Sequence, residues 1–195
     1  APNPFAASTV LSWPGSEGRL RIVDAAGRLR REESWPSGRS SWRFRGKRGV
    51  TGSPALTEAM VYVGCQDWFI YGLDLRSGWP VWRYRANGPV VASAITEGKL
   101  VYVGSTDNQM YALDTDTGRL VWRYTAEGQI SSTAASTDEA IYFGCVDGAI
   151  YSLDAKTGAM RWRFQTEGPV TSSPTLAEGL VFVGSSDRYV YALPL

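Results

Sequence analysis

Short apolar runs separated by turns make up most of the chain. Between residues 100 and 114, "LVYVGS" is a β-branched and aromatic run ending near a glycine, "STDN" has the composition of a turn, and "QMYALD" alternates apolar with polar residues. The turn "DTDTG" and a third run, "RLVWRY", follow. Alternation at a period of two, bounded by such turns, predicts antiparallel β-strands.

A fourth strand is predicted in the segments that link these units. "QISSTAAS" (129–136) and "PVTSSPTL" (169–176) are matching stretches that are rich in small residues. Four antiparallel strands in a unit of 40 residues are typical of a propeller blade.

The unit recurs with a spacing of 40 residues and no gap. A repeat this regular indicates a repeat architecture before any local motif is considered. We therefore predict an all-β fold, a β-propeller of five four-stranded blades, with part of a seven- or eight-bladed propeller as the alternative. The prediction treats residues 1–195 as one domain, with repeats at about 9–48, 49–88, 89–128, 129–168 and 169–195 and residues 1–8 as a candidate closing strand.

Three repeats carry an aspartate, a glycine and a tryptophan at fixed spacing, as in Asp114, Gly118 and Trp122. The carboxylate is expected to accept hydrogen bonds from backbone N–H groups of its own turn. The glycine suits a position with positive φ, and the indole on the outermost strand can cover the gap to the neighbouring blade while its N–H finds a backbone acceptor. The predicted docking residues are Trp42, Trp82, Trp122, Trp162, Gly38, Gly78, Gly118 and Gly158.

The composition excludes several classes of protein. The chain has 195 residues, of which 44% are hydrophobic and 20% charged, as in a globular domain. No apolar run reaches the ~18–20 residues of a membrane-spanning helix, and the start "APNPFAASTV" lacks the features of a signal peptide. Since it begins without methionine, we expect a mature form or a piece of a longer protein. Histidine is absent, which excludes a Ser-His-Asp or Cys-His catalytic site.

Basic residues concentrate in one part of a chain whose net charge is only +1. Residues 19–48 hold ten basic side chains against three acidic ones, so the remaining residues carry a net charge of −6. Such a patch can attract an acidic protein, a nucleic acid or an anionic lipid. The alternative is a solvated edge blade whose charges block aggregation.

Two tryptophans depart from the repeat. Trp68 stands where other copies have Arg, Asn or Gly, and Trp79 stands where they have Arg or Ala. Exposed aromatic rings beside arginines are typical of contact surfaces; the alternative is that both rings lie flat on a neighbouring blade. By contrast, an arginine follows every docking tryptophan, which indicates a structural role. The partner-binding candidates are Arg28, Arg30, Arg31, Arg45, Lys47, Arg48, Trp68 and Trp79.

The repeat resembles that of a known family. The pattern Ala-x-Asp-x-x-Thr-Gly-x-x-x-Trp, complete from Ala112 to Trp122, is similar to the tryptophan-docking motif of the PQQ-like β-propellers, which include quinoprotein alcohol dehydrogenases and BamB-type assembly proteins. The resemblance implies the fold over nearly the whole chain and a periplasmic or surface location. It leaves the function open, because enzymes, scaffolds and sensors share this fold.

The resemblance to the dehydrogenases would imply PQQ, calcium, a carboxylate base and often a disulfide between adjacent cysteines. Cys65 and Cys145 are two repeats apart, too far for a bridge, and are interpreted as free, small, half-buried residues. Free thiols slightly favour a reducing compartment. The aspartates three residues after each strand-ending glycine have turn positions with local hydrogen-bonding tasks; they are Asp67, Asp107, Asp147 and Asp187. We therefore expect no catalytic residue, metal or cofactor.

The expected function is that of a non-enzymatic binding module, a protein–protein scaffold or sensor domain with an acidic protein partner. A fragment of a PQQ-dependent dehydrogenase and a small-molecule sensing domain of a larger receptor or kinase are the alternatives. An open arc of blades would expose unpaired strand edges, so a homo-oligomer is a further expectation.

Overall fold

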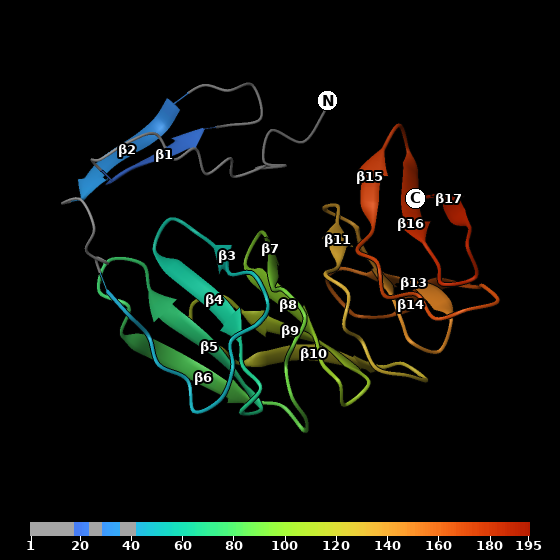
Figure 1. Cartoon of the computed structure of the whole chain (residues 1–195), viewed down its shortest axis with the longest axis horizontal. Helices are drawn as coiled ribbons and strands as arrows, with labels where there is room; N and C mark the ends of the chain where they lie inside the picture. The colour runs from blue at the N-terminus through green and yellow to red at the C-terminus, as the bar shows by residue number, and fades with distance from the viewer. Residues whose placement is uncertain (1–17, 24–28, 36–41) are drawn as a thin grey trace. The chain divides into compact units, whose positions relative to one another are not determined.

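The computed structural model describes residues 18–23, 29–35 and 42–195 (Figure 1). The described residues form strands and turns only, and they include no helix that could cross a bilayer. Two compact units divide the chain, residues 1–43 and 44–195. The candidate closing strand at residues 1–8 and the predicted docking residue Gly38 lie outside the described residues.

The first unit contains one antiparallel pair, β1 (Gly18–Val23) and β2 (Leu29–Trp35). Its register places Arg21 opposite Glu32 and continues to Val23, with an irregularity after Ile22. A fourth strand was expected around Trp42, but residues 42–46 have no strand structure. The four-stranded pattern predicted for every repeat is therefore wrong for this outer strand, because no described strand pairs with it.

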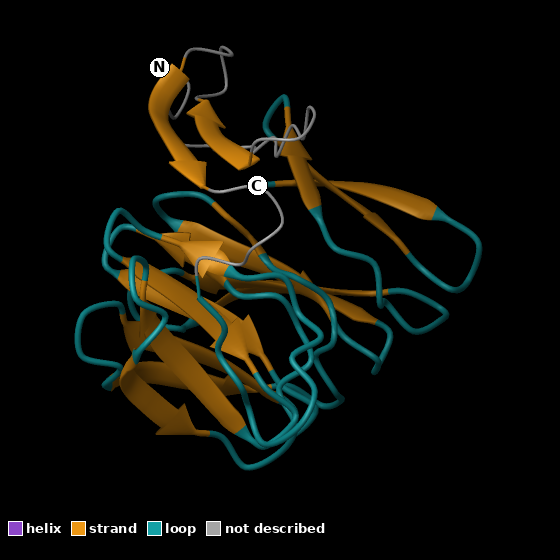
Figure 2. Cartoon of the chain, turned by 60° about the vertical axis from the view of Figure 1, so that its left-hand side comes forward, coloured by secondary structure: helices purple, strands orange, loops and turns teal. Residues whose placement is uncertain are grey.

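Four antiparallel sheets follow one another in the second unit, where each strand pairs with its sequence neighbour (Figure 2). Blade two consists of β3 (Ala55–Leu56), β4 (Met60–Gly64), β5 (Phe69–Asp74) and β6 (Pro80–Arg85). Blade three consists of β7 (Ile95–Glu97), β8 (Leu100–Gly104), β9 (Gln109–Asp114) and β10 (Leu120–Thr125). Blade four consists of β11 (Ala135–Ser136), β12 (Ala140–Gly144), β13 (Ala149–Asp154) and β14 (Met160–Gln165), and blade five of β15 (Thr175–Ala177), β16 (Leu180–Gly184) and β17 (Val190–Pro194).

In the second unit the predicted strands are confirmed except for the innermost one. β9 spans the predicted run "QMYALD", β8 is one residue shorter than its predicted run, and β10 is shifted by one residue. In the segment 129–136, however, only the last two residues form a strand. The Ser132 hydroxyl donates to the Gly144 carbonyl at 2.9 Å and accepts from its N–H at 3.2 Å. A side chain thus replaces the strand ladder in this segment.

The acidic turn has the predicted structural role. Asp114 Oδ1 accepts hydrogen bonds from the Thr117 hydroxyl at 2.7 Å and from the N–H groups of Thr117 and Asp116 at 2.8 and 3.2 Å. The bond from the Thr117 hydroxyl makes the largest contribution to lowering the pKa of Asp114. Gly118 follows with a φ of 67°, a conformation that glycine adopts without strain.

Indole rings join blade two to blade three and blade three to blade four. Trp122 Nε1 donates to the Ala155 carbonyl oxygen in blade four at 2.9 Å, and the Tyr102 hydroxyl donates to the same oxygen at 2.9 Å. A Cβ atom on Gly158, whose φ is 73°, would come within 2.6 Å of the Trp122 ring. The joint between blades two and three repeats these contacts with Trp82, Tyr62, Thr115 and Gly118.

The remaining predicted docking residues differ from these two joints. Trp162 is only half-buried; its ring lies 5.9 Å from that of Tyr142, and its N–H has no acceptor among the described residues. Trp42 belongs to the first unit, so its docking stays a prediction. Gly78 has the expected positive φ of 70°.

We expect Trp122→Ala to lower the free energy of unfolding by about 3–5 kcal/mol, because it removes a buried ring and leaves a cavity at the joint. Trp79→Ala is the matched control, since that indole is 75% exposed, and it is expected to cost less than about 1 kcal/mol. Urea denaturation followed by circular dichroism measures both. Equal losses would show that Trp122 does not anchor the blades.

A substitution of Ser152 is expected to stabilise the protein, whereas Trp122→Ala is expected to destabilise it. Its hydroxyl is fully buried and has no hydrogen-bond partner in the described part of the chain. Burial of an unpaired hydroxyl costs about 1–3 kcal/mol, so Ser152→Ala, which restores the residue found at Ala112, is expected to raise the free energy of unfolding by about 1 kcal/mol. A lower value in the same denaturation experiment would contradict this interpretation.

Candidate partner-binding surface

The partner-binding residues predicted from the sequence do not all lie together in the structure. Arg28 lies outside the described residues, and Arg30 and Arg31 lie in β2 of the first unit. Trp68 and Trp79 flank opposite ends of β5, whose six residues span about 20 Å. The two rings therefore do not form one surface. Both are exposed, Trp68 by 41% and Trp79 by 75%, as one of the two alternatives predicted.

Trp68 occupies a turn that requires a left-handed backbone. Its φ is 76°, and the residues at the equivalent turns of the other blades have φ values of 69°, 84° and 80°. A non-glycine residue in this region costs about 1–2 kcal/mol, and a bulky one is a genuine outlier. Since the ring stays 41% exposed, burial does not fully offset the strain. Strain of this kind is typical of functional positions. The equivalent residues are Asn108, Gly148 and Arg188.

A carboxylate fixes a basic segment beside this turn. Asp67 Oδ2 accepts hydrogen bonds from the Lys47 N–H at 3.1 Å and the Tyr71 hydroxyl at 2.9 Å. The Gln66 N–H also donates to the Gly49 carbonyl at 2.9 Å. These contacts hold residues 47–49 next to Trp68, and the side chains of Lys47 and Arg48 are exposed.

The same contacts set the protonation of the Asp67–Tyr71 pair. Burial alone would raise the pKa of Asp67, but hydrogen bonds from Cys65, Tyr71 and two backbone N–H groups outweigh it and lower that pKa. Burial and the bond to the carboxylate raise the pKa of Tyr71 to about 12. Asp107, Asp147 and Asp187 bond to the matching tyrosines, which confirms a local hydrogen-bonding task for these aspartates.

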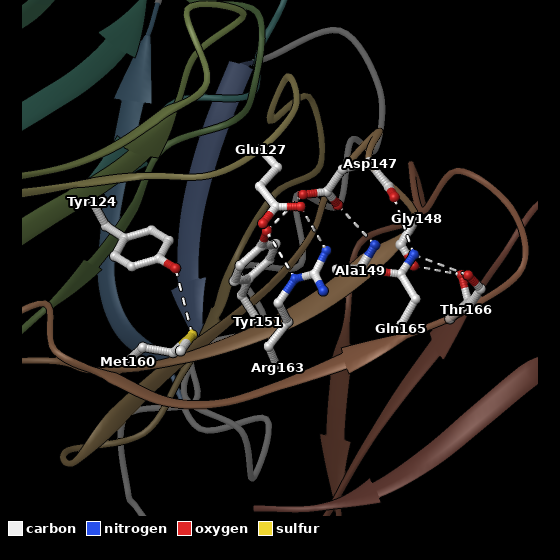
Figure 3. A network of polar contacts seen from close by, with 10 residues as sticks. All are labelled: Tyr124, Glu127, Asp147, Gly148, Ala149, Tyr151, Met160, Arg163, Gln165 and Thr166. Atoms are coloured by element: carbon white, nitrogen blue, oxygen red, sulfur yellow. Dashed lines mark hydrogen bonds and ion pairs between the residues drawn. The ribbon is translucent and has the colours of Figure 1, made fainter.

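An ion pair occupies the matching place between blades three and four (Figure 3). Arg163 Nη2 lies 3.1 Å from Glu127 Oε2, and Arg163 Nε donates to the Tyr151 hydroxyl at 3.2 Å. The guanidinium carbon lies 5.6 Å from the centroid of the Tyr151 ring. The Tyr151–Asp147 hydrogen bond beside this pair recurs as Tyr71–Asp67 in blade two, so the equivalent residues of blade two can be compared directly.

In blade two the acidic member of that pair is replaced by a base. Arg83 corresponds to Arg163, but the residue that corresponds to Glu127 is Lys47. The Arg83 guanidinium lies 5.1 Å from the centroid of the Phe69 ring, and Arg85 lies opposite Phe69 in the β5–β6 ladder. Arg83 and Lys47 are both positively charged, and they occupy the positions at which Arg163 and Glu127 form a salt bridge.

The exposed basic side chains around Trp68 have no acidic partner among the described residues. An uncompensated group of charges beside an exposed aromatic ring can bind an anionic group from outside the chain. Nor does any group of three Asp, Glu or Cys side chains in the described residues form a metal site. We call this group the Trp68 surface; it comprises Trp68, Lys47, Arg48, Arg83 and Arg85. The candidate Arg45 is exposed, but no contact among the described residues places it beside them.

Comparison with known proteins agrees with this framework. The family described as outer membrane protein assembly factor BamB matches residues 16–145 and 127–194. The chain belongs to this family. A comparison with curated proteins gave no match. The family assignment and the structure confirm the predicted all-β propeller of PQQ-like repeats, while the number of five blades remains a prediction.

Three solved structures share the BamB-type fold. BamB from Moraxella catarrhalis has a TM-score of 0.72 and 21% identity, over 81% of this chain and 50% of that one. The computationally designed Ika4 protein has a TM-score of 0.73 and 19% identity, over 81% and 99%. The quinohemoprotein alcohol dehydrogenase ADHIIG from Pseudomonas putida HK5 has a TM-score of 0.65 and 19% identity, over 74% and 30%. This chain therefore spans half the length of the BamB structure.

Arg83 and Arg85 were not among the residues predicted from the sequence, and the cysteines are more deeply buried than predicted. Arg83 belongs to a series of arginines repeated after each docking tryptophan, which suggested a structural role alone. The sequence did contain a signal for Arg83. The residue 36 positions before Arg163 is the acidic Glu127, whereas the residue 36 positions before Arg83 is the basic Lys47. Cys65 and Cys145 are free, as predicted, but fully buried instead of half-buried.

The buried tyrosines make stability depend on pH. Burial and the hydrogen bond to Asp147 raise the pKa of Tyr151 from 10.0 to about 12. Because the folded-state pKa is the higher one, this contribution to stability is complete below pH 10 and is lost as the pH rises towards 12. We expect the free energy of unfolding of Tyr151→Phe to fall less steeply across this window than that of the native protein. Parallel curves in urea denaturation would contradict this.

Proposed function

We propose that this BamB-family chain is a non-enzymatic binding module that holds an acidic segment of a protein partner on the Trp68 surface. The observation that carries the proposal is that Lys47 occupies, beside Arg83, the position at which Glu127 pairs with Arg163. In the proposed complex, a carboxylate of the partner pairs with Arg83 and Lys47, as the Glu127 carboxylate pairs with Arg163. The partner thereby supplies the negative charge that blade two lacks.

The exposed ring gives this surface more than charge. Exposed ion pairs contribute only about 0–1 kcal/mol each, whereas tryptophan and arginine are enriched among residues that dominate binding energy. Trp68 supplies apolar area next to Lys47 and Arg48, so a segment with acidic and apolar residues fits better than a purely acidic one. Such an interaction weakens as salt screens the charges.

A PQQ-dependent dehydrogenase is the alternative from the enzyme class. The likeness to ADHIIG supports it at the level of the fold. Against it, Cys65 and Cys145 belong to blades two and four, and the repeated aspartates bond to their own turns and tyrosines. The scaffold or sensor function therefore has the better support.

Charge reversal at the Trp68 surface tests the proposal. The probe is a fluorescein-labelled peptide of alternating glutamate and leucine, and its binding is followed by fluorescence anisotropy at low and high salt. We expect the double variant Lys47→Glu, Arg48→Glu to bind at least about tenfold more weakly. The matched control is Arg119→Glu, Lys156→Glu, which reverses two exposed charges on the acidic turns and is expected to change affinity less than about twofold.

Trp68→Asn separates binding from folding. Asn108 shows that asparagine is accepted in this turn, so relief of strain offsets the lost packing and the free energy of unfolding is expected to change by less than about 1 kcal/mol. Binding of the peptide is expected to fall about tenfold. Equal losses in both double variants, tighter binding of an oligonucleotide or of anionic vesicles, or dye reduction with added PQQ and calcium would each contradict the proposal.

A further inference from the structure

The turn between the two inner strands of blade three differs from the equivalent turns of blades two and four. Thr57 begins the turn of blade two, and its hydroxyl accepts a hydrogen bond from the Met60 N–H at 3.2 Å. Thr137 does the same for the Ala140 N–H in blade four, at 3.1 Å. In blade three this position holds Glu97. The carboxylate therefore does not serve its turn in the way that the two threonines do.

Glu97 lies at the joint between blades three and four. Its Oε2 atom accepts a hydrogen bond from the Ser136 hydroxyl at 3.3 Å, and β7 and β11 are in contact. Burial and the charge of Glu97 raise the pKa of Tyr102, so this hydroxyl is also close to the carboxylate. Tyr102 and the Trp122 indole both donate to the Ala155 carbonyl oxygen. The carboxylate thus lies next to the contact that holds the two blades together.

A second carboxyl group faces Glu97 across this joint. Asp138 lies in the turn after β11, two residues beyond Ser136, and its side chain is within hydrogen-bonding reach of Glu97. Burial raises the pKa of Glu97 above 4.5, and the charge of Asp138 and the contact with it raise that pKa further. The hydrogen bond from Ser136 offsets part of this effect. Two carboxyl groups this close cannot both ionise without repulsion.

No basic side chain among the described residues compensates this pair of carboxyl groups. Lys99, in the turn after β7, acts on the acidic turn of its own blade. Arg161 of β14 pairs with Glu139 at 3.6 Å. On the neighbouring strands, β8 contributes only the Tyr102 hydroxyl and β3 has no titratable residue. A proton on one of the two carboxyl groups is therefore what relieves the repulsion between them.

We propose that the protonated Glu97 carboxyl donates a hydrogen bond to the Asp138 carboxylate, and that this bond makes the joint between blades three and four sensitive to pH. When Glu97 loses its proton, repulsion between two negative charges replaces the bond and the joint weakens. Because the pKa of Glu97 is higher in the folded chain than in the unfolded one, its contribution to stability is complete below pH 4.5 and is lost as the pH rises. The proposal does not depend on the Trp68 surface.

The joint between blades two and three provides an internal reference for the test. There the Trp82 indole donates to the Thr115 carbonyl at 2.9 Å, but Thr57 occupies the position of Glu97 and carries no charge at any pH. Hydrogen exchange of both indole N–H groups, measured by NMR in one sample, compares the two joints directly. We expect the protection of the Trp122 indole relative to that of Trp82 to fall at least about twofold between about pH 4.5 and pH 7.

Substitutions separate the carboxyl pair from other effects of pH. Glu97→Thr introduces the residue found at Thr57 and is expected to make the relative protection independent of pH. Asp138→Asn is expected to lower the titration midpoint of the Glu97 carboxyl towards 4.5, as followed by NMR of the chain labelled with carbon-13 glutamate. The matched control is Glu58→Gln, which removes an exposed carboxylate at the position of Asp138 in blade two and is expected to change neither measurement.

Three results would overturn the proposal. The first is a relative protection that stays constant with pH in the native chain. The second is a Glu97 midpoint that Asp138→Asn leaves unchanged. The third is a loss of protection with rising pH that persists in Glu97→Thr, because another group would then cause it. Circular dichroism of each variant at both pH values checks that folding is preserved.

Discussion

One backbone carbonyl holds neighbouring blades together at the joint between blades two and three and at the joint between blades three and four. The oxygens of Thr115 and Ala155 each accept hydrogen bonds from an indole and a tyrosine hydroxyl of the preceding blade. The same turn contains the aspartate that organises its backbone and the glycine that lets the ring approach. Because an unpaired buried donor costs about 1–3 kcal/mol, a displaced turn would leave both the indole N–H and the tyrosine hydroxyl without an acceptor. The motif is therefore conserved between repeats for structural reasons.

A fixed framework leaves other positions free to differ in charge. The tether from Asp67 to the Lys47 N–H recurs as the tether from Asp107 to the Asn87 N–H and from Asp187 to the Glu167 N–H. The backbone contact is the same in each case, while the side chain at the tethered position changes from basic to neutral to acidic. The backbone contacts that fix the fold do not depend on the charge of this side chain, so the charge can differ between repeats without loss of the framework.

The sequence predicted the period, the acidic turn and the indole contact because each depends on residues within one repeat or the next. It overestimated the innermost strand, since a pattern of small residues does not reveal that Ser132 bonds to the Gly144 backbone. It also grouped Trp68 with Trp79, although the two flank opposite ends of β5. The Arg83–Lys47 relation emerged only when the Arg163–Glu127 pair showed which positions of consecutive repeats meet.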